Sequence, residues 1–400
     1  MAKVGLVGIG TLPWQERNAE QTFRALAASA AKKALADAGI GRRDIDFVVY
    51  SIFSEVMLRQ QIPTVLLQDY LGFQGLPSYR VEGGSASEGY ALHAAYAAIA
   101  SGRSEIALLV AVQKGSDFYD FVRHSRESGY WSGISNTTDA TWLQPVMPCS
   151  EALLTTSALQ PHIERYGNPT PAQLAAVVVK NRAHAARNPE AQCRDAVSVE
   201  EVLASPPIAG PTTALMRAAR GDAACAIVLA SEAKARALAA TPIWLAGTAT
   251  SSYPTHRAGP QTLGRLRGTQ VAAEKAYRMA GIADPARDVD LVQIHDLISG
   301  VEILAYEELG LCAPGEGGRL VDEGVVALGG RLPCNVDGGR IGCGHAGGVS
   351  GAYAACEIVR QLRETAGDRQ VPLRTGRALL QCMDSHGAMS SVSVFSREGN

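Results

Sequence analysis

Residues 335–348 read NVDGGRIGCGHAGG, and this stretch tells more about the fold than any other part of the chain. Six of its fourteen residues are glycine, a density that a chain requires where it turns tightly or where a ligand approaches the backbone closely. One histidine, His345, lies inside the run. The stretch therefore predicts a turn that presents a polar side chain to a site.

A second segment, Gly83-Gly84-Ser85-Ala86-Ser87, follows a strand-like run and precedes an alanine-rich helical pattern. We expect Ser85 at the N-terminus of that helix, where free N–H groups and the positive end of the helix dipole stabilise an anion. Such a position favours a cysteine thiolate, and a serine hydroxyl is a far weaker nucleophile without a base. Either the chemistry avoids an acyl-enzyme or another group activates Ser85. A structural alternative is a capping box, in which Ser85 caps the helix and Glu88 reaches back.

Two further segments place polar or reactive side chains at the ends of expected strands. His295 and Asp296 end the apolar run 291–294, so both should protrude beyond the sheet edge. Cys382 lies in residues 380–387, where another strand runs into a turn. These four segments carry the candidate chemistry of the chain.

A short sequence pattern that occurs twice divides the chain into two halves. Ala38-Gly39-Ile40 leads through an acidic turn into the apolar run 47–50, and Ala280-Gly281-Ile282 leads through a similar turn into 291–294. In both, an alanine-rich helix ends at glycine and a strand follows. The matching order predicts a duplicated α/β unit, with one copy in residues 1–240 and the other in residues 241–400.

Hydrophobic patterning predicts the elements of both halves. Strands are expected at 4–9, 45–53, 78–82, 106–112, 224–230, 243–247, 291–295, 378–383 and 390–395. Helices are expected at 19–37, 63–71, 85–100, 171–186, 270–279, 300–309 and 348–365. This alternation is typical of a layered α/β fold. Residues 115–223 interrupt the first half, and an insertion of that length predicts a cap or substrate-binding region.

Composition limits the classes of function. The chain has 400 residues, 46% of them hydrophobic, and a formal net charge of -2, so it can bury a large core and is not expected to bind nucleic acid or an anionic membrane. The N-terminal apolar run is too short for a signal peptide, which predicts a cytoplasmic protein. None of the eight cysteines forms a CxxC pair or a zinc-type spacing with histidine, so we expect no metal site in this chain.

The four segments, in this order, resemble the thiolase superfamily, nearest its sterol-carrier-protein-type, acetyl-CoA acetyltransferase-like branch. Residues 330–333 followed by 337–348 resemble the glycine-rich stretch that ends in the family's Gly-His motif. His295-Asp296 resembles the His-Asp motif of this branch, and Cys382 resembles the cysteine of the C-terminal Cys-x-Gly motif. Ser85 falls on the position of the acylated cysteine.

The resemblance implies a thiolase fold, with two duplicated βαβαβαββ halves forming a layered α-β-α-β-α sandwich and an inserted loop domain. It implies that His345 polarises a thioester carbonyl and acts as a base, that His295 helps to hold an oxyanion, and that Cys382 moves a proton at the substrate α-carbon. The backbone N–H of Ser85 would add to a second oxyanion hole. Asp384 stands where the motif has glycine, and we expect its carboxylate to raise the pKa of Cys382.

The implied substrate is an acyl-CoA, with coenzyme A as substrate or product and no covalently bound cofactor. A homodimer is expected, together with a small zinc-ribbon/OB-fold partner protein that would hold any zinc. Trp131 and Trp142, in the insertion, suggest a bulky or aromatic acyl group.

Three functions fit the sequence. The first is a thiolase-like acyltransferase, which performs β-keto acyl-CoA thiolysis or the reverse Claisen condensation. The second is a CoA-dependent aldolase or retro-aldolase that forms no acyl-enzyme. The third is a non-catalytic subunit of a complex. Ser85 is open to three interpretations at this point: a natural loss of the nucleophile, a cysteine replaced by design, or a serine that performs the acyl step.

Overall fold

The fold is described from a computed structural model that covers residues 3–119, 124–125, 149–239, 241–254 and 262–399. Trp131 and Trp142 lie outside the described residues. No described helix combines the length and the apolar character needed to cross a bilayer.

Nine strands form one mixed sheet in the order β3-β2-β4-β7-β1-β8-β11-β10-β9. They are β1 (Val4–Thr11), β2 (Phe47–Ser51), β3 (Ser78–Val81), β4 (Ile106–Gln113), β7 (Ala223–Ser231), β8 (Ile243–Ser252), β9 (Leu291–Gln293), β10 (Arg377–Met383) and β11 (Met389–Ser396). All nine predicted strands are confirmed, although their ends differ by a few residues. A separate ribbon in the insertion pairs β5 (Pro207–Ala209) with β6 (Thr212–Thr213).

The helices fall into three groups. The first half contains α1 (Phe23–Asp37), α2 (Glu55–Leu58), α3 (Pro63–Leu71), α4 (Ser87–Ala100) and, after β7, α10 (Glu232–Leu238). The insertion contains α6 (Ser150–Leu154), α7 (Gln160–Tyr166), α8 (Pro171–Ala186) and α9 (Val199–Ala204). The second half contains α11 (Arg267–Ala280), α12 (Pro285–Asp288), α13 (Ser299–Glu308), α14 (Gly317–Asp322), α15 (Gly339–Cys343) and α16 (Ser350–Leu362).

The second half repeats the strand order of the first. From the outer edge inward, the first half runs β3-β2-β4-β7-β1 and the second runs β9-β10-β11-β8, so β9 corresponds to β2. Cys334 makes an isolated parallel bridge to Val292 where a counterpart of β3 would lie. The predicted duplication is therefore visible in the topology, while the boundary at residue 240 stays a prediction.

The repeated sequence pattern at residues 38–40 and 280–282 has a structural basis. Gly39 and Gly281 follow α1 and α11 with φ values of 68° and 67°, a left-handed conformation that glycine adopts without steric cost. Asp46, just before β2, accepts a hydrogen bond from the N–H of Glu105 ahead of β4. Asp290, just before β9, accepts one from the N–H of Thr375 ahead of β10. The two aspartates thus brace the same strand pair in each half.

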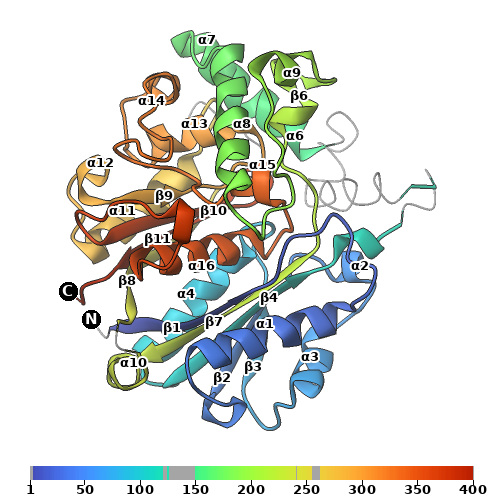
Figure 1. The fold of residues 1–400 in the computed structure, drawn as a ribbon, viewed down its shortest axis with the longest axis vertical. Coiled ribbons are helices and arrows are strands. Elements are labelled where there is room, and N and C mark those ends of the chain that lie inside the picture. The colour runs from blue at the N-terminus through green and yellow to red at the C-terminus, as the bar shows by residue number, and fades with distance from the viewer. Residues whose placement is uncertain (1–2, 120–123, 126–148, 240, 255–261, 400) are drawn as a thin grey trace.

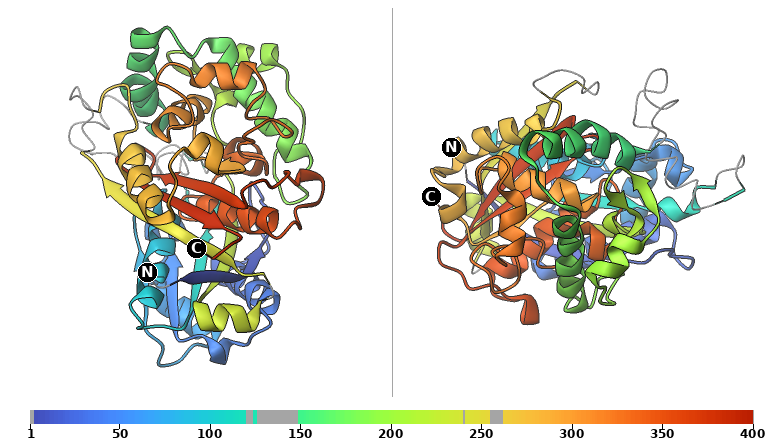
Figure 2. Two further views of the ribbon diagram at one scale, coloured as in Figure 1. Left: turned by 90° about the vertical axis from the view of Figure 1, so that its left-hand side faces the viewer. Right: turned by 90° about the horizontal axis from the view of Figure 1, so that it is seen from above.

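The sheet and helices stack in layers (Figure 1). Helices α4 and α16 lie between the two parts of the sheet, α1 and α3 cover the outer face of the first part, and α11 covers that of the second. Three buried hydrophobic clusters fill the spaces between these layers. The insertion gathers over the second half (Figure 2), where α8 packs against α13, α14 and α15. This arrangement brings both halves and the insertion to the N-terminal ends of α4 and α16.

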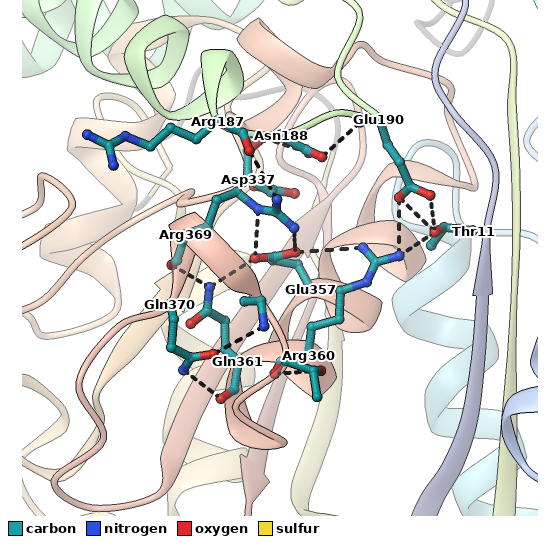
Figure 3. A network of polar contacts seen from close by, with 12 residues as sticks. Thr11, Arg187, Asn188, Glu190, Asp337, Glu357, Arg360, Gln361, Arg369 and Gln370 are labelled. Carbon is teal, nitrogen blue, oxygen red and sulfur yellow. Dashed lines mark hydrogen bonds and ion pairs between the residues drawn. The ribbon is translucent and has the colours of Figure 1, made fainter.

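A buried ionic network ties α16 to the first half and to the insertion (Figure 3). Glu357 on α16 accepts hydrogen bonds from Arg369 at 3.2 and 3.0 Å and lies 3.7 Å from Arg360. Arg360 in turn bonds to Glu190 of the insertion and to Thr11 at the end of β1. These contacts therefore join α16 to the first half and to the insertion.

Candidate active site

Ser85 lies in a tight turn just before α4. The helix begins at Ser87, two residues later than predicted, and Gly84 in the turn before it has a φ of 58°. A Cβ added to Gly84 would lie 3.0 Å from Cβ of Asp384, so the turn packs closely against residues 384–388. Ser85 is fully buried, and its Oγ lies 2.8 Å from Oγ of Ser385. A hydroxyl from the second half therefore faces Ser85.

The capping box considered from the sequence does not form. The hydroxyl of Ser87 closes the turn instead, accepting from the Gly83 N–H at 2.9 Å and donating to the Gly84 carbonyl at 2.6 Å. Glu88 points to the second half, where its Oε1 accepts the N–H of Gly351 at 2.7 Å. Glu88 thus links α4 to α16.

His345 lies between the end of α15 and the start of α16. Its Nδ1 lies 3.1 Å from Oγ of Ser350, and this Oγ accepts the N–H of Ala346 and donates to its carbonyl. Because the single hydroxyl proton is committed to that carbonyl, Nδ1 of His345 is best assigned as the donor and Nε2 as the acceptor nitrogen. Burial, helped by the nearby charge of Arg340, lowers the pKa of His345 to about 3. His345 is therefore a neutral imidazole at physiological pH.

His295 lies against His345, with ring centroids 5.5 Å apart in an edge-to-face arrangement. Its backbone N–H is held by Gln381 at 2.9 Å. Its ring is fully buried, and neither ring nitrogen has a hydrogen-bond partner in the described part of the chain. Burial, Arg340 and His345 hold the pKa of His295 well below its usual range. A neutral ring with unmet polar atoms is suited to contact a substrate oxygen.

Asp296 anchors the segment that carries His295. Its carboxylate accepts the N–H groups of Arg340 at 2.7 Å and Ile341 at 3.1 Å, and the side chain of Asn181 at 2.9 Å. Asn181 also donates to Glu302, which in turn pairs with the largely buried Lys180 at 2.8 Å. Helix α8 of the insertion thus braces the His-Asp segment.

Cys382 is buried on the side of β10 that faces α4 and α16. A Cβ added to Gly351 would lie 2.3 Å from Sγ of Cys382 and 2.6 Å from Cγ of Glu88, so the thiol and this carboxylate are neighbours. Burial, followed by the charge of Glu88, raises the pKa of Cys382 to about 12. Burial and Glu88 are the leading causes of this shift, whereas the effect of Asp384, whose carboxylate accepts the N–H of Ala388 at 2.8 Å, stays a prediction.

Arg340 is the buried residue that links these groups, and the sequence analysis did not propose it. Its Nη1 donates to the carbonyl of Ile294 at 2.9 Å, directly before His295. Its guanidinium lies 3.8 Å from Glu88 and 3.9 Å from Asp296. The signal available in the sequence was a lone arginine inside the glycine-rich run.

The four predicted site residues therefore occupy one region. His295 and His345 touch, Ser85 meets the turn that follows Cys382, and Cys382 lies one layer deeper beside Glu88. Sequence reasoning missed Ser350, Ser385 and Arg340, each of which contacts a predicted residue or its neighbour across the fold.

Comparisons with known proteins agree with this arrangement. Residues 9–201 match the family model "Thiolase, N-terminal domain", and residues 248–397 match "Thiolase C-terminal domain-like". An acetyl-CoA acetyltransferase of Methanothermobacter thermautotrophicus is 32% identical over 99% of this chain and 100% of its own. Sterol carrier protein 2 of Homo sapiens is 30% identical over 93% of this chain and 68% of its own.

A solved structure described as "Ltp2-ChsH2(DUF35) aldolase" shares the fold, with a TM-score of 0.82 and 23% identity over 99% of this chain and 98% of that chain. Two family models in the expected order, relatives that match along nearly the whole chain, and the duplicated sheet lead to one conclusion: this chain belongs to the thiolase family.

Proposed function

We propose that this protein makes or breaks a carbon–carbon bond beside a CoA thioester by aldol chemistry, without an acyl-enzyme on Ser85. The observation that carries the proposal is the 2.8 Å contact between the hydroxyls of Ser85 and Ser385. Within the described residues, no imidazole or carboxylate hydrogen-bonds to Ser85 Oγ. A hydroxyl partner does not remove a proton at neutral pH, so Ser85 lacks the base that an acylated serine needs.

The two neutral histidines suit the cleavage of a β-hydroxy acyl-CoA. Nε2 of His345 removes the proton of the β-hydroxyl, and the bond between Cα and Cβ breaks to release an aldehyde or ketone. The electron pair of that bond forms the enolate of the thioester. An N–H of His295 donates to the enolate oxygen, and a donor placed in this way contributes about 3–4 kcal/mol to the barrier reduction.

Protonation of the enolate at Cα yields a shorter acyl-CoA, and proton exchange with solvent then returns His345 to its neutral form and Cys382 to its thiol. Cys382 is the donor we assign to this step, since a thiol whose pKa is about 12 keeps its proton at neutral pH. An enolate carbon is more basic than such a thiolate. Cys382 therefore serves as an acid at the α-carbon rather than as a nucleophile.

Acyl transfer is the second candidate. It is supported by the relative from Methanothermobacter thermautotrophicus, which is named as an acetyl-CoA acetyltransferase. Thiolysis or Claisen condensation would require Ser85 to accept the acyl group, and hence a rearrangement that brings a base to its hydroxyl.

Intact-mass measurement after incubation with acetyl-CoA separates the two candidates. The parent protein is expected to gain no acetyl group, because Ser85 has no base. Ser85→Cys is expected to acquire one acetyl group, because a thiolate forms readily at a helix N-terminus. Ser85→Ala is the control for acylation elsewhere. An acetyl group on the parent that Ser85→Ala abolishes would contradict the aldol proposal and support acyl transfer.

Assembly is part of the proposal. A homodimer is supported by the position of β3 at an edge of the sheet, where Tyr79 is 46% exposed. A partner protein, which the resemblance implies to be a small zinc-ribbon/OB-fold protein, is supported by the aldolase of similar fold, whose name joins Ltp2 with ChsH2(DUF35).

A further inference from the structure

Arg340 occupies an unusual position for a charged residue. It is only 3% exposed and projects from α15, between the segment of His295 and the first turn of α4. Nη1 hydrogen-bonds to the carbonyl of Ile294, whereas Nε and Nη2 hydrogen-bond to no oxygen in the described residues. A buried guanidinium with unmet donors is costly.

Two buried carboxylates balance this charge from opposite sides. Oε1 of Glu88 lies 3.8 Å from Nη2, and Oδ1 of Asp296 lies 3.9 Å from Nη1. Oε2 of Glu88 has no partner in the described residues. The carboxylate of Asp296 also holds the backbone N–H of Arg340. Arg340 is thus fixed at both ends, by its own backbone and through its guanidinium.

Arg340 links the segments that carry the candidate site residues by direct contacts as well as by its charge. Glu88 lies three residues after Ser85, Ile294 and Asp296 flank His295, and His345 ends the same glycine-rich run as Arg340. One side chain therefore contacts α4 and the His-Asp segment from within the stretch that carries His345.

We propose that Arg340 is the positioning residue of this site. Its guanidinium, balanced by Glu88 and Asp296, clamps the His295 segment to the helix that follows Ser85. Its fixed positive charge adds to burial in disfavouring the protonated form of both rings. This assignment concerns the histidines themselves, so it can be tested whichever reaction the site performs.

Among the charged groups near the two imidazole rings, Arg340 carries the positive charge that disfavours their protonation. The ionisable groups that face this region are Arg340 on α15, Glu88 on α4, Asp296 after β9, Glu302 on α13, Lys180 on α8 and Cys382 on β10. After burial, Arg340 is the next largest cause that lowers the pKa of both His295 and His345. Arg340 also opposes the effect of burial on Glu88, whose pKa is nevertheless raised to about 7.

The test compares Arg340→Met with Arg340→Lys by NMR of protein labelled with ¹⁵N in the histidine rings. His295→Asn and His345→Asn assign the two rings. Methionine removes the cation at similar volume, whereas lysine keeps it. At pH 5, the ratio of protonated to neutral imidazole is expected to be at least about tenfold higher in Arg340→Met than in Arg340→Lys for both rings. Equal ratios in the two variants would overturn the proposal.

A second readout uses Glu88. Without Arg340, the raised pKa of the Glu88 carboxyl rises further, so the folded state binds that proton more tightly than the unfolded chain does. The stability of Arg340→Met should therefore fall as the pH rises from 5 to 8, and the double variant Arg340→Met/Glu88→Gln should keep only the smaller slope that comes from Asp296, whose raised pKa Arg340 also opposes. The same slope in both variants would show that Glu88 is not the countercharge and would overturn that part of the proposal.

The double variant also protects the test if Arg340→Met alone does not fold. It removes the cation together with one anion, so less uncompensated charge stays buried. Glu88 is not among the causes that shift the pKa of His295 or His345, so its replacement by itself leaves their protonation unchanged. A rise in imidazole protonation in the double variant would therefore come from Arg340 and support the proposal, and no rise would contradict it.

Discussion

Replacing His345 with alanine is expected to lower the rate of β-hydroxy acyl-CoA cleavage by about 10²–10⁴-fold. The imidazole is the proposed base, and its Nδ1 contact with Ser350 fixes the tautomer that leaves Nε2 as an acceptor. With a pKa of about 3, the parent histidine is neutral throughout the range from pH 5 to 8. Its protonation should therefore not limit the rate in that range, as steady-state kinetics across it can check.

His93→Ala is the matched control for this experiment. His93 lies on α4 and is partly buried, so its loss tests whether removing any histidine from this layer slows the reaction. The control should retain the parental rate. A His345→Ala variant that remains folded and turns over within a few-fold of the parent would remove His345 from the mechanism.

Replacing Glu357 with alanine is expected to reduce the free energy of unfolding by about 3–5 kcal/mol. Glu357 is fully buried and accepts two hydrogen bonds from Arg369, and it also lies 3.7 Å from Arg360. Without Glu357, the two largely buried guanidinium groups lose their shared counterion. The uncompensated buried charge lowers the free energy of unfolding by more than the ion pair itself adds to it. Urea denaturation monitored by circular dichroism measures the change.

Glu232→Ala is the control for charge removal at the surface. Glu232 pairs with Arg236 on α10, where both side chains are exposed to solvent, and such pairs contribute little to stability. Its denaturation midpoint should match that of the parent. An equal effect of the two substitutions would show that the buried network does not hold α16 in place.

Apolar runs and helix-ending glycines in the sequence were sufficient to predict the main strands and helices of the fold. The strands are continuous apolar runs, and Gly39 and Gly281 end helices at positions with a left-handed backbone conformation, which glycine adopts without steric cost. Hence the strands of the main sheet, the longer helices and their repetition could be predicted, whereas short helices such as α2, α12 and α15 could not. The start of α4 could not, since Ser85-x-x-Glu88 satisfies the capping-box pattern while Glu88 is recruited by Gly351 in the other half.

The candidate site likewise contains residues that the sequence could identify and residues that it could not. His295 and His345 could be found because each lies in a segment with its own signature, and the structure brings their rings into contact. Ser385 and Arg340 could not be found, since their roles arise from contacts with residues about 300 and 250 positions earlier along the chain. Tertiary packing alone decides which polar side chain faces Ser85.

The central claim is that carbon–carbon bond chemistry occurs here without an acyl-enzyme on Ser85. Its most direct test is the rate at which Ser85→Ala releases carbonyl product from a β-hydroxy acyl-CoA, relative to the parent, with His345→Ala as the inactive reference. The account predicts that Ser85→Ala stays within about tenfold of the parent, because the hydroxyl contributes at most a hydrogen bond. A rate as low as that of His345→Ala would contradict it.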